Sequence, residues 1–384
     1  MTRLARRLDA LWFPEAPAAR LAMLRILIGA FSLWLVGTEY PVWVTVGQTK
    51  AALFQPVGVV ALLSHPLSPA LHEALVLATL VASVPFLLGW RYRFTGPLFA
   101  ALLFWVLSYR QSWSMVYHSE NLLVLHVLIL ALAPAADALS LDARRAAGAG
   151  PGRGLPSVWA RWRGRLHVAR SGSALRGIPL AARHLVLGLM PSAETAAVSA
   201  SRTAASEQQA LSLERRRDPA GAWEYGWPIR LMCVVTALAY FVTGMAKVTG
   251  ELGWSWVSGE ALRSQVAADA LRKEVLGDAG SSLFYIVYPQ LWLFTCFGVM
   301  TLLVELGAPF ALLNKRLARL WAVNAFLMHW GILFIMGIKF RYHLSGVIYA
   351  PLFEVEWLAG WAGAWWRRWA TARAVPVHPA NLGP

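Results

Sequence analysis

The sequence predicts an all-α protein, a polytopic transmembrane helical bundle of about eight spans with both termini cytoplasmic. Of 384 residues, 58% are hydrophobic and only 14% are charged, whereas a soluble domain normally carries about 25% charged residues. Several apolar runs reach about 20 residues, the length that crosses roughly 30 Å of hydrocarbon as a helix. The 20 tryptophans suit aromatic belts at the two membrane interfaces.

Eight apolar segments define the predicted spans. They cover residues 20–37, 68–89, 94–109, 119–138, 228–247, 289–313, 317–338 and 344–365. Between the first two, residues 40–63 have room for a short re-entrant or interfacial helix. The chain begins with a basic segment that is interrupted by prolines. This pattern indicates an amphipathic cytoplasmic segment before the first span, and not a cleaved signal peptide.

The arginines support this count and set the orientation. With a cytoplasmic N-terminus, every inside segment is basic, as the positive-inside rule requires. These segments are residues 3–7, 91–93, 140–227, 315–319 and 365–369. The outside connections carry far fewer cations, apart from residues 339–343. The arginine- and alanine-rich composition suggests a bacterium with GC-rich DNA, so we expect a bacterial inner membrane.

The long basic loop divides the membrane domain into two parts. Spans one to four lie in residues 1–139, spans five to eight in 228–369, and a cytoplasmic tail covers 370–384. The loop 140–227 is expected to be partly amphipathic, near WARWRGRLHVAR, and otherwise disordered. The net charge of +15 lies mainly in such loops, which favours anionic lipid headgroups over nucleic acid as its partner.

Two other kinds of site have no support in the sequence. Cys233 and Cys296 both lie in apolar runs, where a cysteine usually acts as a small hydrophobic residue. No metal-binding spacing connects the histidines, so no metal site is predicted. No GxSxG segment is present to suggest a nucleophilic serine.

Ionisable groups inside spans are costly and are usually functional or paired. Lys247 ends the fifth predicted span, and His118 lies at the outer start of the fourth. The predicted topology therefore puts both near the outer face. A buried lysine loses its charge more readily and can act as a base, but a lysine at a span's end more often extends to the headgroups.

The other ionisable groups within the predicted spans can also be explained by structural roles. Arg25 lies within the first span, and an acid such as Glu305, deep in the sixth, is a possible partner that would hold helices together. His329 in the seventh span and His126 in the fourth suit hydrogen bonds between helices.

Several segments, in order, resemble the vitamin K-dependent gamma-carboxylases. The segment around Lys247 reads YFVTGMAKV, with Gly244 three residues before the lysine. His118 opens YHSENLLVLHVLILALAPAADALSLDA, and the last segments read LLVELGAPF, FLMHWGILFIMGIKF and LFEVEW. The start, LAMLRILIGAFSLW, resembles the wider HTTM (horizontally transferred transmembrane) family. The resemblance covers most of residues 15–365 outside the basic loop.

The resemblance implies a quinone-linked membrane enzyme whose active face points outward. Lys247 would be the base that deprotonates reduced vitamin K or another quinol, and His118 would contact the quinone-derived oxygen. The predicted catalytic residues are Lys247 and His118, and the predicted substrate-binding residues are His329, Trp256, Asn121 and Glu305.

Two departures from the carboxylases leave the activity open. Ala246 stands where those enzymes have a second lysine, and we expect the large luminal substrate domain of the animal enzymes to be absent. The alternative is a non-enzymatic membrane scaffold or a maturation partner for an exported peptide or protein. A transporter is a third hypothesis. It is the weakest of the three, because the sequence shows no pair of broken helices.

Overall fold

The computed structural model describes residues 11–113, 118–148, 222–278 and 281–361 of the chain. These ranges are helical, with an isolated bridge between Ala16 and Ala222 and no strand among them. The described residues up to 144 and from 222 onward belong to one compact unit, which contains the features below. The predicted amphipathic segment of the basic loop and the tail 370–384 lie outside the described residues.

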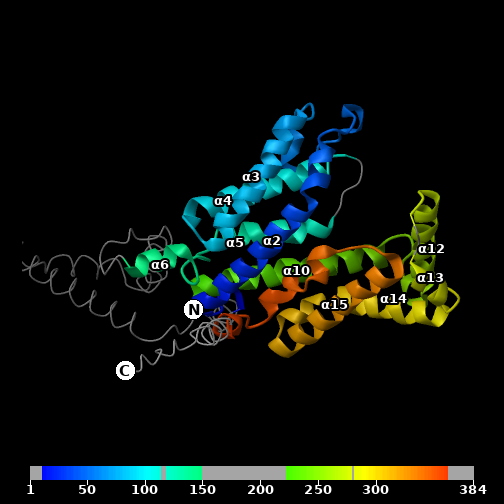
Figure 1. Ribbon diagram of the computed structural model, residues 1–384. Helices are drawn as coiled ribbons and strands as arrows, with labels where there is room; N and C mark the ends of the chain where they lie inside the picture. Colours follow the sequence, from blue (N-terminus) through cyan, green and yellow to red (C-terminus); the bar gives the residue numbers. More distant parts are fainter. Residues whose placement is uncertain (1–10, 114–117, 149–221, 279–280, 362–384) are drawn as a thin grey trace, which may run out of the picture. The chain divides into compact units, whose positions relative to one another are not determined.

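Four helices are long and apolar enough to cross a membrane: α2 (Ala18–Val46), α3 (Pro69–Leu88), α10 (Trp223–Thr249) and α15 (Lys315–Met336) (Figure 1). Two shorter apolar helices are α5 (Asn121–Ala131) and α14 (Leu291–Leu306), and α4 (Tyr92–Arg110) lies between α3 and α5 in the chain. The helical fold class is confirmed for the described residues. Eight spans and cytoplasmic termini stay predictions.

Local sequence fixes the ends of these helices. The Ser68 side chain accepts a hydrogen bond from the first turn of α3, Pro69 starts that helix, and Gly89 ends it with φ +62°. Asn314 caps α15 in the same way, and Gly337 ends α15 with φ +67°. A short polar side chain at the start and a glycine in the left-handed region at the end are the usual helix limits.

The helices pack in two neighbouring groups. In the first, α2 packs on α3, α3 on α4, and α4 on α5. In the second, α10 packs on α14, and α15 packs on the 3-10 helix η5 (Ala308–Leu312). The helix α10 also contacts α2 and α5, so it joins the two groups. One continuous apolar core runs through both.

The last predicted span is not one continuous helix in the part that the structure describes. Instead of a helix over 344–365, the chain forms the short helix α16 (Arg341–Leu344) and the 3-10 helix η6 (Val347–Leu352). Ile348 and Tyr349 are 1% and 3% exposed, and η6 packs against α2, α10 and α15. Irregular backbone at membrane depth is tolerated where protein surrounds it. The chain becomes helical again at residues 357–361, so the prediction of a continuous eighth helical span is wrong for residues 344–356.

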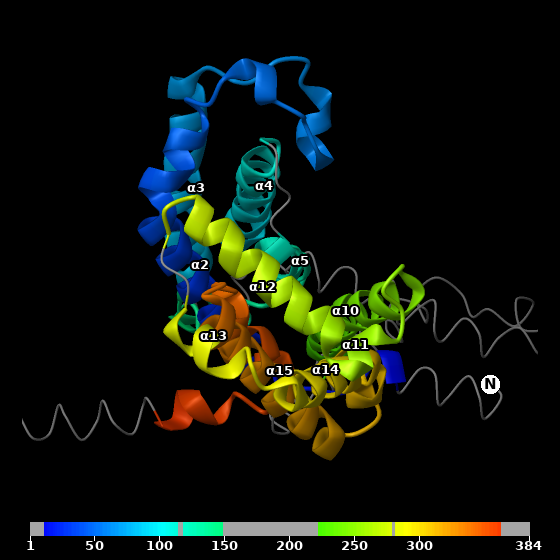
Figure 2. The ribbon, with the colours of Figure 1, turned by 90° about the vertical axis from the view of Figure 1, so that its right-hand side faces the viewer.

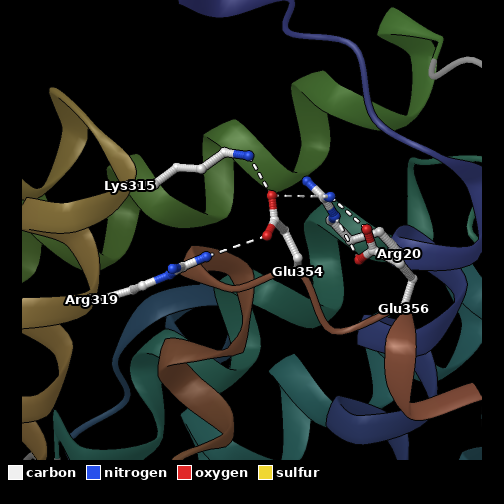
Figure 3. Close-up of polar contacts among 5 residues, drawn as sticks. All are labelled: Arg20, Lys315, Arg319, Glu354 and Glu356. Atoms are coloured by element: carbon white, nitrogen blue, oxygen red, sulfur yellow. Dashed lines mark hydrogen bonds and ion pairs between the residues drawn. The ribbon is translucent and has the colours of Figure 1, made fainter. Parts of the chain in front are cut away.

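An ion-pair cluster ties the end of this last segment to two helix starts (Figure 3). Arg20 of α2 donates two hydrogen bonds to Glu356, at 2.8 and 2.6 Å. Glu354 pairs with Lys315 and, at 3.3 Å, with Arg319, both in α15. The segment after η6 is thus clamped to the end of the bundle where α2 and α15 begin.

This clamp gives a pH prediction. The hydrogen bonds from Arg20 lower the pKa of Glu356, and the bond from Lys315 lowers the pKa of Glu354. A lowered pKa adds stability that is present above the unfolded value of about 4.3 and is lost as pH falls through the folded pKa. We therefore expect backbone amides 358 and 359 to lose hydrogen-exchange protection below about pH 4, with α10 amides as the reference. Protection that stays constant relative to α10 down to pH 3 would contradict the clamp.

A small helical cap occupies residues that were expected to be a connection between spans five and six. It consists of α11 (Ser255–Ser258), α12 (Glu260–Val275) and α13 (Ser282–Val287). It has a core of its own, made of Val266, Ala270, Phe284, Val287 and Phe294. In Figures 1 and 2 α12 lies across the direction of α10 and not along it.

The stretch 40–63 also differs in detail from the prediction. The helix α2 continues to Val46, and the remainder forms two 3-10 helices, η1 (Ala51–Leu53) and η2 (Gly58–Leu62). Phe54, directly after η1, and Val60 of η2 pack with Tyr109 and Trp113 in a small apolar cluster at the end of α4.

Candidate functional site

One face of α10 carries polar or small residues at helical spacing. Thr236, Tyr240, Gly244 and Lys247 follow one another at intervals of four, four and three residues, which places them on the same side of the helix. Thr236 meets His126 of α5, Tyr240 meets His329 of α15, and Gly244 and Lys247 both meet Glu305 of α14. The face thus forms a polar stripe that leads through the bundle to the end of α10 beneath the cap.

Lys247 and Glu305 form an ion pair at the cap end of this stripe. Lys247 Nζ lies 2.5 and 2.7 Å from the two carboxylate oxygens of Glu305. The Lys247 side chain is 19% exposed and the Glu305 side chain is 6% exposed. Glu305 is therefore buried, and Lys247 lies partly at the surface of the bundle. The Nζ atom also lies 5.4 Å from the ring centroid of Trp256, which α11 carries. A cation over an aromatic face adds further attraction.

Gly244 allows this pair to form. A Cβ atom on Gly244 would lie 2.8 Å from Glu305 Cβ and 3.0 Å from a methyl carbon of Leu306. Glycine therefore lets α14 approach α10 closely enough for the lysine to reach the carboxylate. The same glycine belongs to the segment on which the family resemblance rests.

The pairing of Arg25 with Glu305 considered from the sequence is wrong. Arg25 is fully buried in α2 and donates to the carbonyl oxygen of Leu139 at 2.6 Å. Its guanidinium carbon lies 5.8 Å from the ring centroid of Tyr92. Arg25 thus joins α2 to the segment after α5, while Glu305 binds Lys247.

Tyr240, two turns before Lys247 on the same face of α10, belongs to a buried group of aromatic side chains. Its hydroxyl lies 2.7 Å from the Tyr349 hydroxyl and 3.4 Å from His329 Nδ1. His329 stacks on His343, with ring centroids 4.2 Å apart and planes at 16°. A proton on His329 Nδ1 would be donated to the carbonyl oxygen of Ala325 at 2.9 Å. Both histidines and both tyrosines are buried.

His126 forms the next step of the stripe. Its ring nitrogens lie 2.7 Å from the Tyr342 hydroxyl and 3.0 Å from Thr236 Oγ1. His126 is fully buried and joins α5, α10 and α16. The hydrogen bonds between helices expected for this histidine are confirmed.

The two residues predicted at the start of α5 are less closely tied to the site. His118 begins the 3-10 helix η3 (His118–Glu120), which packs against α16, and its side chain lies outside the described part of the chain. Its convergence with Lys247 stays a prediction. Asn121 accepts a hydrogen bond from Gln111 at 3.1 Å on an exposed surface, and none of its described contacts involves the ion pair.

The structure therefore brings together Lys247, Glu305 and Trp256 of the predicted site. His329 contacts Tyr240, two turns away on the same face of α10. Sequence reasoning missed Tyr240, although its spacing of seven residues from Lys247 puts it on the same helix face. It also missed Tyr349, whose position depends on the irregular last segment.

The residues around the pair fit a quinol-type molecule in chemical character. Lys247 Nζ and the Glu305 carboxylate can hydrogen-bond a hydroxyl, and the Trp256 ring offers an aromatic face. For a metal ion, the described residues provide no group of three or more His, Cys, Asp or Glu ligands.

The fold and this site define a helical protein with membrane-spanning character and a buried polar stripe that ends in an ion pair. Comparison of the chain with protein-family models, with curated proteins and with solved structures gives no match. The resemblance to the gamma-carboxylases and the HTTM family therefore rests on the sequence segments alone.

Proposed function

We propose that the chain is a quinol-linked membrane enzyme in which the Lys247–Glu305 pair handles the transferred proton. The observation that carries the proposal is the ion pair itself, a partly exposed amine and a buried carboxylate 2.5 Å apart under an aromatic ring. The proposed setting is a bacterial inner membrane with this end outward. The proposed acceptor chemistry resembles that of the carboxylases.

The pair can hold its shared proton in two ways. The charged form has an ammonium on Lys247 and a carboxylate on Glu305, and the neutral form has an amine and a carboxylic acid. Exclusion of water makes the charged form more costly and brings the two closer in free energy. In the neutral form Lys247 Nζ can accept a proton. A bound quinol would supply the ionisable hydroxyl and the reducing electrons, and molecular oxygen, the oxidant in the carboxylases that the sequence resembles, would accept these electrons.

Lys247→Arg tests this role. Arginine keeps the positive charge and can still pair with Glu305, but it is not deprotonated in proteins. We expect quinol oxidation by the purified variant in lipid nanodiscs to fall at least about 100-fold, the lower range for loss of a general base. Lys273→Arg is the matched control, because Lys273 also lies near this end and pairs with an acid, Asp269, at 2.7 Å. Full activity in Lys247→Arg would overturn the proposal.

A second function, a non-enzymatic scaffold or a maturation partner for an exported peptide, is favoured by the same contact. The ion pair joins α10 to α14, and in this function Lys247 only holds the helices together. The scaffold predicts that Lys247→Arg retains both the fold and the cellular function. It also predicts no quinol turnover in the unmodified protein.

A further inference from the structure

The start of α15 presents cations above an exposed apolar surface. Lys315, Arg316 and Arg319 lie in its first five residues, and all three are exposed. Glu354 pairs with Lys315 and Arg319 (Figure 3), and none of the ion pairs described in this cluster involves Arg316. With Arg20, Glu354 and Glu356 included, the group has four positive and two negative charges. An anion could therefore bind here without displacing the two glutamates.

A stripe of apolar side chains continues from Arg316 along α15. Leu320, Val323 and Leu327 follow Arg316 at intervals of four, three and four residues, so they share one face of the helix. They are 62%, 52% and 56% exposed. From Arg316 to Leu327 the helix rises about 16 Å, close to half of the roughly 30 Å hydrocarbon thickness.

We infer that this face of α15 binds an anionic phospholipid. The phosphate group would contact Arg316, Lys315 and Arg319, and one acyl chain would lie along Leu320, Val323 and Leu327. The surplus of positive charge is complementary to the negative phosphate of the headgroup. The length of the apolar stripe is similar to the hydrocarbon thickness of one leaflet. Basic sites between or beside membrane helices commonly recognise such headgroups. The inference assigns a specific lipid site, and it does not depend on the proposed quinol chemistry.

The lipid would also reinforce the clamp on the last segment. Exposed ion pairs contribute little stability in water, and Glu354 makes its contacts with Lys315 and Arg319 at such an exposed position. A phosphate bound beside the same cations would hold their side chains near Glu354. The site thus couples the composition of the surrounding leaflet to the order of the irregular segment that precedes Glu354.

Native mass spectrometry of the full chain in detergent, titrated with phosphatidylglycerol or phosphatidylcholine, tests the site. We expect phosphatidylglycerol to bind more tightly, and Arg316→Gln to weaken it about fivefold, the effect of one cation near an anionic surface. The matched control is Arg272→Gln in α12, which removes one exposed positive charge from the cap. It is expected to leave the affinity unchanged.

A second variant separates the lipid from a free phosphate. Leu320→Asn should weaken phosphatidylglycerol binding while leaving the charges intact, and inorganic phosphate should raise the melting temperature much less than the lipid does. Equal affinity for the two lipids, equal losses in Arg316→Gln and Arg272→Gln, or equal stabilisation by inorganic phosphate would each overturn the inference. Both variants lie on exposed positions, and their unchanged melting temperature in phosphatidylcholine serves as the folding check.

Discussion

Lys247→Met is expected to destabilise the protein by about 3 kcal/mol, because removal of one member of a buried ion pair leaves the other charge without compensation. Glu305 is the group left behind, and its side chain is 6% exposed. It lies between α10 and α14, where no rotation of a short side chain reaches water easily. Equilibrium unfolding in mixed micelles measures the loss.

Glu305→Gln is expected to cost less than half of that amount. The lysine left behind lies near the end of α10, has a long side chain and is already 19% exposed, so it can extend its ammonium to the interface. The double variant Lys247→Met with Glu305→Met should recover part of the loss, since two apolar side chains replace two charges. Equal losses in the two single variants would contradict the burial asymmetry.

Gly259→Ala is expected to cost about 2–4 kcal/mol, from strain at positive φ together with overpacking. Gly259 has φ +80°, and a Cβ atom there would lie 2.3 Å from the Thr295 nitrogen and 2.4 Å from the Phe294 carbonyl carbon. The obstacle is the backbone of α14, which cannot rotate away. Because Gly259 follows α11 directly, the displacement should also move Trp256 and increase the reaction of Lys247 with an amine-acetylating reagent.

Gly277→Ala is the matched control for this variant. Gly277 also has φ +80°, but a Cβ atom there meets nothing within 4 Å. It should show only the backbone strain, about 1 kcal/mol, and unchanged acetylation of Lys247. If the two alanine variants lose the same stability, close packing between α11 and α14 does not hold the cap in place.

The sequence predicts the fold class well because apolar length is a property of single segments. Lys247, Glu305 and Trp256 could likewise be selected, since charges in apolar runs and nearby tryptophans are visible in the sequence. Their mutual contact could not be predicted. Lys247 and Glu305 are 58 residues apart, and the choice of α14 as the neighbour of α10 depends on close packing at Gly244.

The irregular last segment shows a different limit. Residues 344–361 are apolar enough to suggest a span, but composition reports burial and not helical geometry. Gly346 with φ +75° and Pro351 inside η6 are the local signals against a continuous helix. Tyr349 reaches Tyr240 only because this segment departs from helical geometry.

The same segment has a consequence for how the protein is made. A stretch that is broken into short helical pieces satisfies only part of its backbone hydrogen bonds within itself, and it cannot partition into lipid alone. The insertion of α16 and η6 into the bundle therefore requires that α2, α10 and α15, which they pack against, are already in place. Assembly of the protein is therefore sequential. The upstream helices come together first, and the final segment then packs against them.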